Sequence, residues 1–227
     1  MEQLSVAHLA ALGVTAAVAL AVIAAAWHGP GSWAVRFARG LGLLLAVDIV
    51  AYHTVQISRD SWSADFDLPF HLTDAAAIVA ALALWRPHWM LLELTYFWGL
   101  TGSLLAILTP DLNRTFPDFF YFNYFVSHSG VVVAAVFLVA ATGFAPRPGA
   151  VGRTFLATAA LAAVAALANV LTGANYMFLA ERPSSPSPLD LMGPWPWYIA
   201  SAALVALALF SFLDAPFRRR RRVSHVC

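Results

Sequence analysis

Two short polar elements interrupt the apolar stretches of this chain and carry the residue types best suited to chemistry. One is the segment HLTD at residues 71–74, and the other is the segment SHSG at residues 127–130. A hydroxyl becomes a useful nucleophile when a base takes its proton, and histidine is well matched to that task. Thr73 lies two residues from His71, so on a helix the two side chains point to different faces. The base for Thr73 must therefore come from another helix, and His128 is one candidate.

Four further polar residues could complete a site built on Thr73. His53 is the second candidate for the base, whereas His71 and Asp74 are three residues apart and share one helix face. Those two could orient the base or polarise a substrate carbonyl, and Asn175 could donate a hydrogen bond to an oxyanion. Structural roles are the alternative. Thr73 could bond back to a helical carbonyl, Asp74 could favour a helix start, and the histidine and amide side chains could join helices.

The composition predicts an integral membrane protein. Of the 227 residues, 61% are hydrophobic and only 11% are charged, with a mean hydropathy of +0.74, whereas a soluble domain carries about 25% charged residues. The single cysteine is the last residue, Cys227, which excludes an internal disulfide and a thiolate metal site. The three histidines named above could bind a metal, but they lack the spacing of a metal-binding helix. We therefore expect no metal, no cofactor and no nucleic-acid partner.

Seven stretches are long and apolar enough to cross a bilayer as helices, since a span needs about 20 residues. They cover residues 4–26, 37–57, 68–85, 89–108, 122–142, 154–179 and 194–213. The sequence predicts an all-α bundle of about seven transmembrane helices over residues 1–217, followed by a basic cytoplasmic tail at 218–227. The first stretch has no basic residue before it, so we expect a retained helix of a multi-pass protein of the cell membrane rather than a signal peptide.

The arginines predict the orientation of the bundle. All 13 basic residues are arginine, and ten of them fall on one side of the membrane if the N-terminus is outside; the other three are Arg59, Arg114 and Arg182. The positive-inside rule then favours an outer N-terminus and an inner C-terminus. A run of arginines at the C-terminal end is expected to bind anionic lipid of the inner leaflet. It consists of Arg218, Arg219, Arg220, Arg221 and Arg222.

This orientation sorts the polar residues of the spans into layers. Glu93 falls near the inner end of its span, where we expect it to pair with Arg86 or another inner arginine. The outer third of the membrane contains the candidate residues His53, His71, Thr73, Asp74, His128 and Asn175. A charged group inside a span costs roughly 2.5–3.5 kcal/mol, so a cluster of titratable side chains at one depth indicates a functional site.

Five motifs carry a resemblance to a known family over nearly the whole chain. They are residues 68–74 (LPFHLTD), 93–100 (ELTYFWGL), 127–130 (SHSG), 173–177 (GANYM) and 189–198 (LDLMGPWPWY). The chain resembles the bacterial YwaF-type integral membrane family. That family is similar to a eukaryotic transmembrane acyltransferase that places polyunsaturated chains on ether phospholipids. More distantly, it is similar to the androgen-induced threonine–histidine hydrolases of fatty-acid esters of hydroxy fatty acids.

The resemblance implies roles for two residues. By motif position, the nucleophile and the histidine of these enzymes fall on Thr73 and His128. The eukaryotic acyltransferase is thought to use a cysteine, and this chain departs from that pattern with a threonine, as in the distant hydrolases. A threonine ester is a less activated acyl carrier than a thioester, which favours hydrolysis or slow transfer.

Three functional hypotheses follow for the outer polar layer. The first is an enzyme acting on acyl esters of membrane lipids, with Thr73 as nucleophile and His128 as base. The second is a transporter or proton-coupled carrier, which predicts pH-dependent flux and no acyl adduct on Thr73. The third is a non-catalytic membrane scaffold, which predicts that hydrogen bonds between helices use up all of these polar groups.

Overall fold

The chain folds as an assembly of helices, as its composition predicts. The computed structural model describes residues 2–223, with side chains up to residue 218, and contains no strand in that part of the chain. Its α-helices are α1 (Val6–Trp27), α2 (Ser32–Ser58), α3 (Leu72–Trp85), α4 (Trp89–Trp98), α5 (Leu104–Leu108), α6 (Phe119–Thr142), α7 (Ala150–Thr172) and α8 (Trp197–Val223). A π-helical turn, η1 (Gly99–Ser103), joins α4 to α5, and two short 3₁₀ turns, η2 (Tyr176–Phe178) and η3 (Pro188–Leu191), lie between α7 and α8. The all-α prediction is confirmed.

Several helices are long and apolar enough to cross a membrane. Within the described residues, five segments meet this condition: Val6–Trp27, Trp89–Leu108, Phe119–Thr142, Ala150–Thr172 and Trp197–Arg218. The segment Trp89–Leu108 is the continuous run of α4, η1 and α5. The chain is thus a multi-pass membrane protein by helix length and composition. The full set of seven spans, which adds α2 and the 14-residue α3, stays a prediction, as does the orientation.

Several predicted spans differ at their ends from the helices that form, and two of these differences lie next to the candidate residues. The third begins at Leu72 rather than residue 68, because the backbone turns at Pro69, where the Phe70 N–H donates to the Leu68 carbonyl at 2.8 Å, and His71 is the extended N-cap residue with φ −69° and ψ 147°. The sixth ends at Thr172 rather than residue 179, because Gly173 adopts a left-handed conformation with φ +75° and stops the helix. The late start of α3 and the early end of α7 leave irregular backbone at two places in the predicted outer layer.

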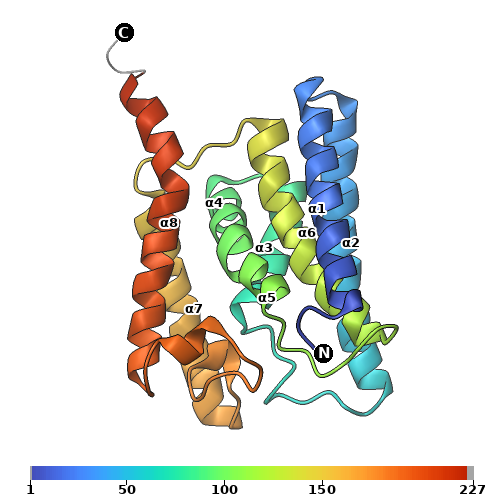
Figure 1. Ribbon diagram of the computed structural model, residues 1–227, viewed down its shortest axis with the longest axis vertical. Coiled ribbons are helices and arrows are strands. Elements are labelled where there is room, and N and C mark those ends of the chain that lie inside the picture. Colours follow the sequence, from blue (N-terminus) through green and yellow to red (C-terminus); the bar gives the residue numbers. More distant parts are fainter. Residues whose placement is uncertain (1, 224–227) are drawn as a thin grey trace.

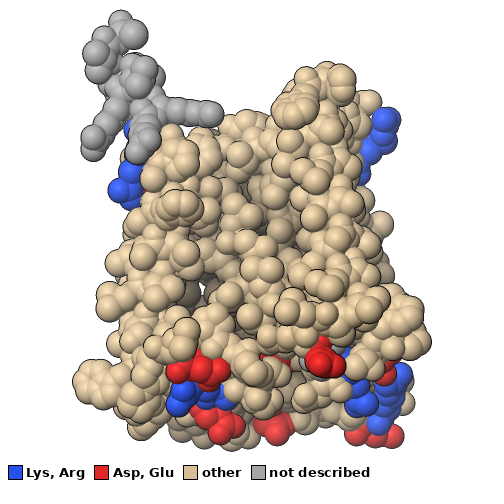
Figure 2. Space-filling model, viewed as in Figure 1, with Lys and Arg blue, Asp and Glu red and all other residues tan. Residues whose placement is uncertain are grey.

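Helix α6 is the centre of the molecule, and α7 and α8 form a separate pair at one side (Figure 1). Helices α1, α2, α3 and α4 all pack on α6, whereas α7 and α8 reach the rest of the bundle mainly through α4 and η1. In Figure 2 the surface is hollowed between the α7–α8 pair and the other helices. The same view shows a wide uncharged belt, with the visible acidic side chains gathered at the end of the molecule where α1 begins.

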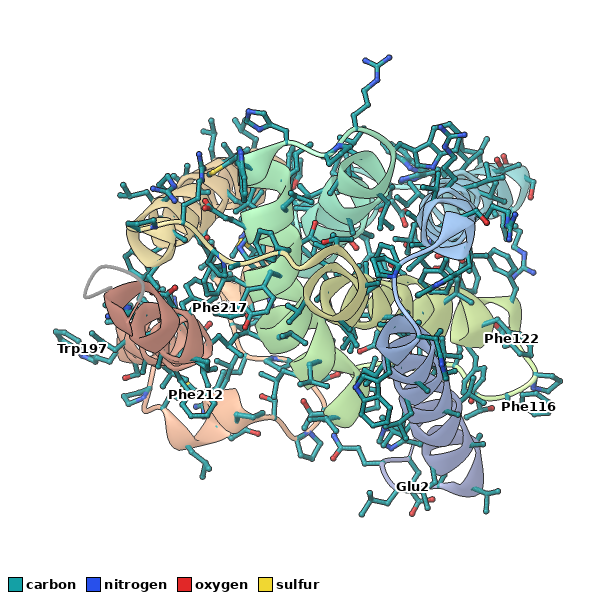
Figure 3. The ribbon with its side chains drawn as sticks, turned by 90° about the horizontal axis from the view of Figure 1, so that it is seen from above. Glu2, Phe116, Phe122, Trp197, Phe212 and Phe217 are labelled. Atoms are coloured by element: carbon teal, nitrogen blue, oxygen red, sulfur yellow. The ribbon has the colours of Figure 1, made fainter. Side chains whose placement is uncertain are left out.

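The α7–α8 pair is fixed to α4 by aromatic side chains. The Tyr96 hydroxyl donates to the Leu213 carbonyl at 3.1 Å, and its ring meets Phe217 at a centroid distance of 5.9 Å. The Trp98 indole donates to the Thr158 hydroxyl at 2.8 Å. Seen from above, Phe217 is turned toward the bundle and Trp197 is turned away from it (Figure 3). These contacts hold the pair near α4 and leave other parts of both helices unpacked.

An ion-pair cluster adds a second attachment at the predicted inner end. Glu93 on α4 is fully buried and pairs with Arg147, before α7, at 3.0 Å and with Arg153, on α7, at 2.8 Å. The expectation that Glu93 pairs with an arginine is confirmed, with Arg147 and Arg153 in place of Arg86, whereas the inner position of this cluster stays a prediction. Both arginine side chains stay partly exposed, so the surrounding water or headgroups can solvate them.

Helix α8 continues into the predicted basic tail. It runs to Val223, and Arg218 pairs with Asp214 one turn earlier at 2.5 Å. The side chains of Arg219, Arg220, Arg221 and Arg222 lie outside the described residues, as does Cys227. The boundary at residue 218 between bundle and tail therefore falls within a single helix.

Candidate functional site

Thr73 lies on the face of α3 that packs into the bundle. Ala76, Ala77 and Ala80 are at most 1% exposed, and they follow Thr73 by three, four and seven residues. In the described part of the chain, no hydrogen bond involves the Thr73 hydroxyl. The residue four positions earlier is Pro69, which precedes the helix, so no helical carbonyl is available there. The alternative in which Thr73 bonds back to its own helix does not hold, and its hydroxyl is free for other chemistry.

Threonines farther along the helices behave differently. Their hydroxyls donate to the carbonyl four residues back, as is usual for threonine in apolar helices. They are Thr15, Thr54, Thr95, Thr101, Thr109, Thr142, Thr158 and Thr172. Thr73 differs from these eight and resembles Thr154 on α7, whose hydroxyl also has no hydrogen-bond partner among the described residues.

The His128 ring is oriented as a base. Its Nδ1 lies 2.6 Å from the carbonyl oxygen of Tyr124, and the two rings stack at a centroid distance of 4.1 Å. A carbonyl only accepts, so Nδ1 carries the proton and the lone pair of the neutral ring is on Nε2. Among the described residues, none bonds to Nε2, although the side chain is only 9% exposed. His128 therefore has a fixed tautomer with a basic nitrogen that is not in use.

The His71 ring is held in the opposite sense. Its Nδ1 accepts the backbone N–H of Met177 at 3.2 Å, so the proton of the neutral ring is on Nε2. The ring packs on Tyr176 and Phe178 with centroid distances of 5.3 and 5.5 Å. His71 is close enough to His128 for their charges to interact. The fold thus brings a donor imidazole from the start of α3 near a basic imidazole from α6.

The turn η1 contacts both α3 and α6 and so relates the positions of their residues along the bundle. A Cβ on Gly99 would lie 2.9 Å from the Val131 carbonyl, and one on Gly102 would lie 3.0 Å from the Leu72 side chain. His128 is about one turn nearer the start of α6 than Val131, and Thr73 follows Leu72 directly. These contacts put the start of α3 and the His128 turn of α6 at one level.

Asp74 supports the start of α3 and faces an acidic group. Its carboxylate receives a backbone hydrogen bond from His71 and interacts electrostatically with Asp67. Asp67 is nearly buried and accepts hydrogen bonds from the Tyr52 hydroxyl at 2.5 Å and the Gln56 amide at 2.8 Å. Asp74 therefore acts first as a helix-start residue that holds the backbone of His71.

His53 and Asn175 are engaged elsewhere. The Nδ1 of His53 accepts the Trp62 indole N–H at 3.3 Å. The Asn175 amide oxygen accepts the N–H groups of Ala180 and Glu181, and its nitrogen donates to the Glu181 carbonyl at 2.9 Å. Their described hydrogen bonds lead away from Thr73 and His128. Across the residues that the structure describes, no three histidine, cysteine, aspartate or glutamate side chains lie close enough together to hold a metal ion.

Three residues that the sequence analysis did not single out help to hold the site. Tyr124 fixes the His128 ring, and helical spacing could have found it, because it lies four residues before His128. Met177 fixes His71 through its backbone, which no side-chain motif reports. Asp111 interacts electrostatically with both His71 and Tyr124 from the loop after α5.

Comparison with known proteins places the chain in a family. No solved structure matches it. An uncharacterized protein of Treponema pallidum (strain Nichols) is 31% identical over 117 residues, which cover 52% of this chain and 49% of that protein. The match therefore spans about half the length of that relative. The TMEM164 family matches residues 3–214, nearly the whole chain. The protein thus belongs to the TMEM164 family.

Proposed function

We propose that this protein hydrolyses or transfers the acyl chains of membrane-lipid esters, at the outer-leaflet side of the bilayer. Thr73 is the nucleophile and His128 is the general base. The observation that carries the proposal is the contrast between the two imidazoles: Nε2 of His128 has a free lone pair, and Nε2 of the neighbouring His71 carries a proton. An ester needs both, since a base activates the nucleophile and a donor stabilises the oxyanion.

The reaction proceeds in two steps of acyl transfer. The Thr73 hydroxyl oxygen attacks the ester carbonyl carbon, and its proton moves to Nε2 of His128. The bond between the carbonyl carbon and the oxygen of the lipid alcohol then breaks. The departing oxygen takes the proton from Nε2 of His128, and the acyl chain remains as an ester on Thr73. Water or the hydroxyl of an acceptor lipid attacks this ester with the same histidine as base. No cofactor is required for this sequence.

The supporting residues hold the donor side of the site. The Nε2–H of His71 donates a hydrogen bond to the developing oxyanion. Met177 holds the ring of His71, and Asp74 holds its backbone N–H. His53 and Asn175 contribute to the walls and loops around this arrangement. The site thus depends on the junction between the start of α3 and the segment after α7.

The surface of the molecule favours a lipid as the substrate. On the face seen in Figure 2, a wide uncharged belt crosses the molecule, and the hollow beside the α7–α8 pair opens within it. The resemblance to ether-phospholipid acyltransferases and to threonine–histidine ester hydrolases agrees with this choice. The arginine run that starts at Arg218 would bind anionic inner-leaflet lipid by charge.

A proton-coupled carrier is the second candidate, favoured by the electrostatic contact between Asp67 and Asp74 next to His71. Neighbouring carboxylates and an imidazole inside a membrane protein are common parts of proton pathways. The two candidates differ in their products. A carrier moves a solute and leaves lipid unchanged, whereas the proposed enzyme releases or transfers fatty acid.

The test is lipid turnover by the purified protein in bilayer discs. A phospholipid with an isotope-labelled acyl chain is added, and mass spectrometry follows free fatty acid and newly acylated lipid. Thr73→Ala and His128→Ala should lower turnover at least about 10²-fold. Thr142→Ala, which removes a back-bonded hydroxyl at the other end of α6, should keep it. A folded Thr73→Ala or His128→Ala variant with full turnover would refute the proposal.

A further inference from the structure

Ser103 has a buried hydroxyl that no group among the described residues satisfies. It is the last residue of η1, its side chain is fully buried, and its Oγ has no hydrogen-bond partner. Two residues earlier, Thr101 makes the usual bond to the carbonyl four positions back, at 2.6 Å. An unpaired polar group in an apolar interior costs free energy, so such a group is kept where something else uses it.

The surrounding backbone explains why Ser103 differs from its neighbours. In a π turn the N–H of residue i+5 bonds to the carbonyl of residue i, and the Leu104 N–H indeed reaches the Gly99 carbonyl. That carbonyl is the one to which a serine at position 103 would bond back. π turns inside α-helices are rare, and they occur frequently at functional sites.

The register between the two helix runs places Ser103 opposite His128. Gly99 packs against Val131, and the Tyr124 hydroxyl donates to the Ala106 carbonyl at 2.8 Å. These two contacts are seven residues apart on each run, and the runs are antiparallel. Ser103 follows Gly99 by four residues, while His128 precedes Val131 by three. The two side chains therefore occupy facing positions in the turn between these contacts.

We infer that the Ser103 hydroxyl binds the carbonyl oxygen of an acyl ester, as a second donor beside His71. This inference rests on the proposed function and names a further substrate-binding residue for it. The ligand class is a lipid ester or another carbonyl compound of an acyl chain, since a hydroxyl donor needs an acceptor oxygen. The side chains that close over Ser103 must part as the ester enters.

A binding experiment tests this role without relying on turnover. The host is the Thr73→Ala variant, which retains Ser103 and consumes no ester. A fluorescent phospholipid bound to it is displaced by a short-chain diacyl phosphatidylcholine or by its dialkyl ether analogue, which lacks the carbonyl oxygens. One hydrogen bond gives a preference of roughly fivefold for the ester.

Ser103→Ala in this host should lower the preference about fivefold and leave only the part that His71 supplies, and Ser103→Cys, with its weak donor, should lower it less. Thr154→Val is the matched control, because Thr154 is also fully buried and unpartnered but lies near the start of α7. It should keep the preference. The inference is overturned if the host shows no ester preference, or if Ser103→Ala retains the full preference of the host.

Turnover provides the second readout. In the active protein, Ser103→Ala should lower kcat about 10²-fold while its thermal stability stays equal or rises, because an unsatisfied polar group is removed. A parallel fall in stability and turnover would mean a structural role and contradict the inference. An ester preference without any turnover in the parent protein would instead refute the proposed enzyme and leave Ser103 as a carbonyl-binding residue.

Discussion

The imidazoles of His71 and His128 are tied to the backbone in opposite senses. Met177 N–H donates to Nδ1 of His71 at 3.2 Å, whereas Nδ1 of His128 donates to the Tyr124 carbonyl at 2.6 Å. Each contact fixes one tautomer, so the remaining ring nitrogens form a donor and a base. Backbone contacts thus determine which histidine is the donor and which is the base, and no third charged side chain is required.

Asparagine variants of the two histidines should separate these roles. An asparagine amide can replace Nδ1 in either backbone contact, but it supplies neither the base of His128 nor the distal N–H of His71. We expect His128→Asn to abolish turnover and His71→Asn to lower kcat about 10²–10³-fold with little change in KM. Steady-state lipid turnover measures both. Equal KM and kcat in His71→Asn and the parent protein would exclude an oxyanion role.

The buried carboxylate of Glu93 should contribute strongly to stability. Glu93→Gln leaves Arg147 and Arg153 without their counter-charge, and we expect a loss of about 1–3 kcal/mol in unfolding free energy. This is below the cost for a fully buried pair, because both arginines are partly exposed. Thermal unfolding in detergent checks it. Arg182→Gln is the control and should be nearly neutral, because it removes only exposed contacts to Asp190, an ion pair of 3.7 Å and a hydrogen bond of 3.4 Å to the backbone carbonyl.

The glycine contact between η1 and α6 should tolerate no side chain. Gly99→Ala puts a Cβ 2.9 Å from the Val131 carbonyl and 3.0 Å from the Ala135 Cβ, and backbone cannot yield as a flexible side chain would. We expect a destabilisation of about 1–3 kcal/mol together with reduced turnover. Gly13→Ala, with nothing within 4 Å, should be neutral or stabilising by up to about 1 kcal/mol. Equal unfolding temperatures for the two variants would contradict this packing.

Cysteine labelling tests the predicted orientation. In a Cys227→Ser background, Asn113→Cys places a thiol in the loop between α5 and α6, and His28→Cys places one between α1 and α2. Both positions are exposed. With an outer N-terminus, a membrane-impermeant maleimide should label the first variant in intact cells and the second only after permeabilisation. The reverse pattern would place the proposed site at the inner leaflet.

Apolar length alone was enough to predict where the helical segments lie, since each predicted span overlaps one, and the fourth is the continuous run of α4, η1 and α5. Their ends depended on local backbone that hydropathy does not report, such as the turn at Pro69 with the extended His71 and the left-handed Gly173. The common depth of His71 and His128 followed from the span order. The tautomers did not, because they depend on tertiary contacts of Met177 and on the helical carbonyl of Tyr124.

Other parts of the site had no signal in the sequence. The π turn at Gly99–Ser103 follows from packing against α6, and nothing in its residue types distinguishes it from an α-helical turn. Asn175 looked suited to an oxyanion, but a helix that ends at Gly173 leaves it to cap its own loop. The choice of Arg147 and Arg153 over Arg86 as partners of Glu93 likewise depends on how the loop before α7 folds back on α4.

Covalent labelling of the nucleophile tests the central claim most directly. A long-chain alkyl fluorophosphonate reacts with a hydroxyl whose proton a neighbouring base removes, with loss of fluoride. After digestion, mass spectrometry should find the phosphonate on Thr73 in the parent protein and no adduct in the His128→Ala variant. An adduct on a different residue, or labelling of Thr73 that is unchanged by His128→Ala, would contradict the Thr73–His128 pair.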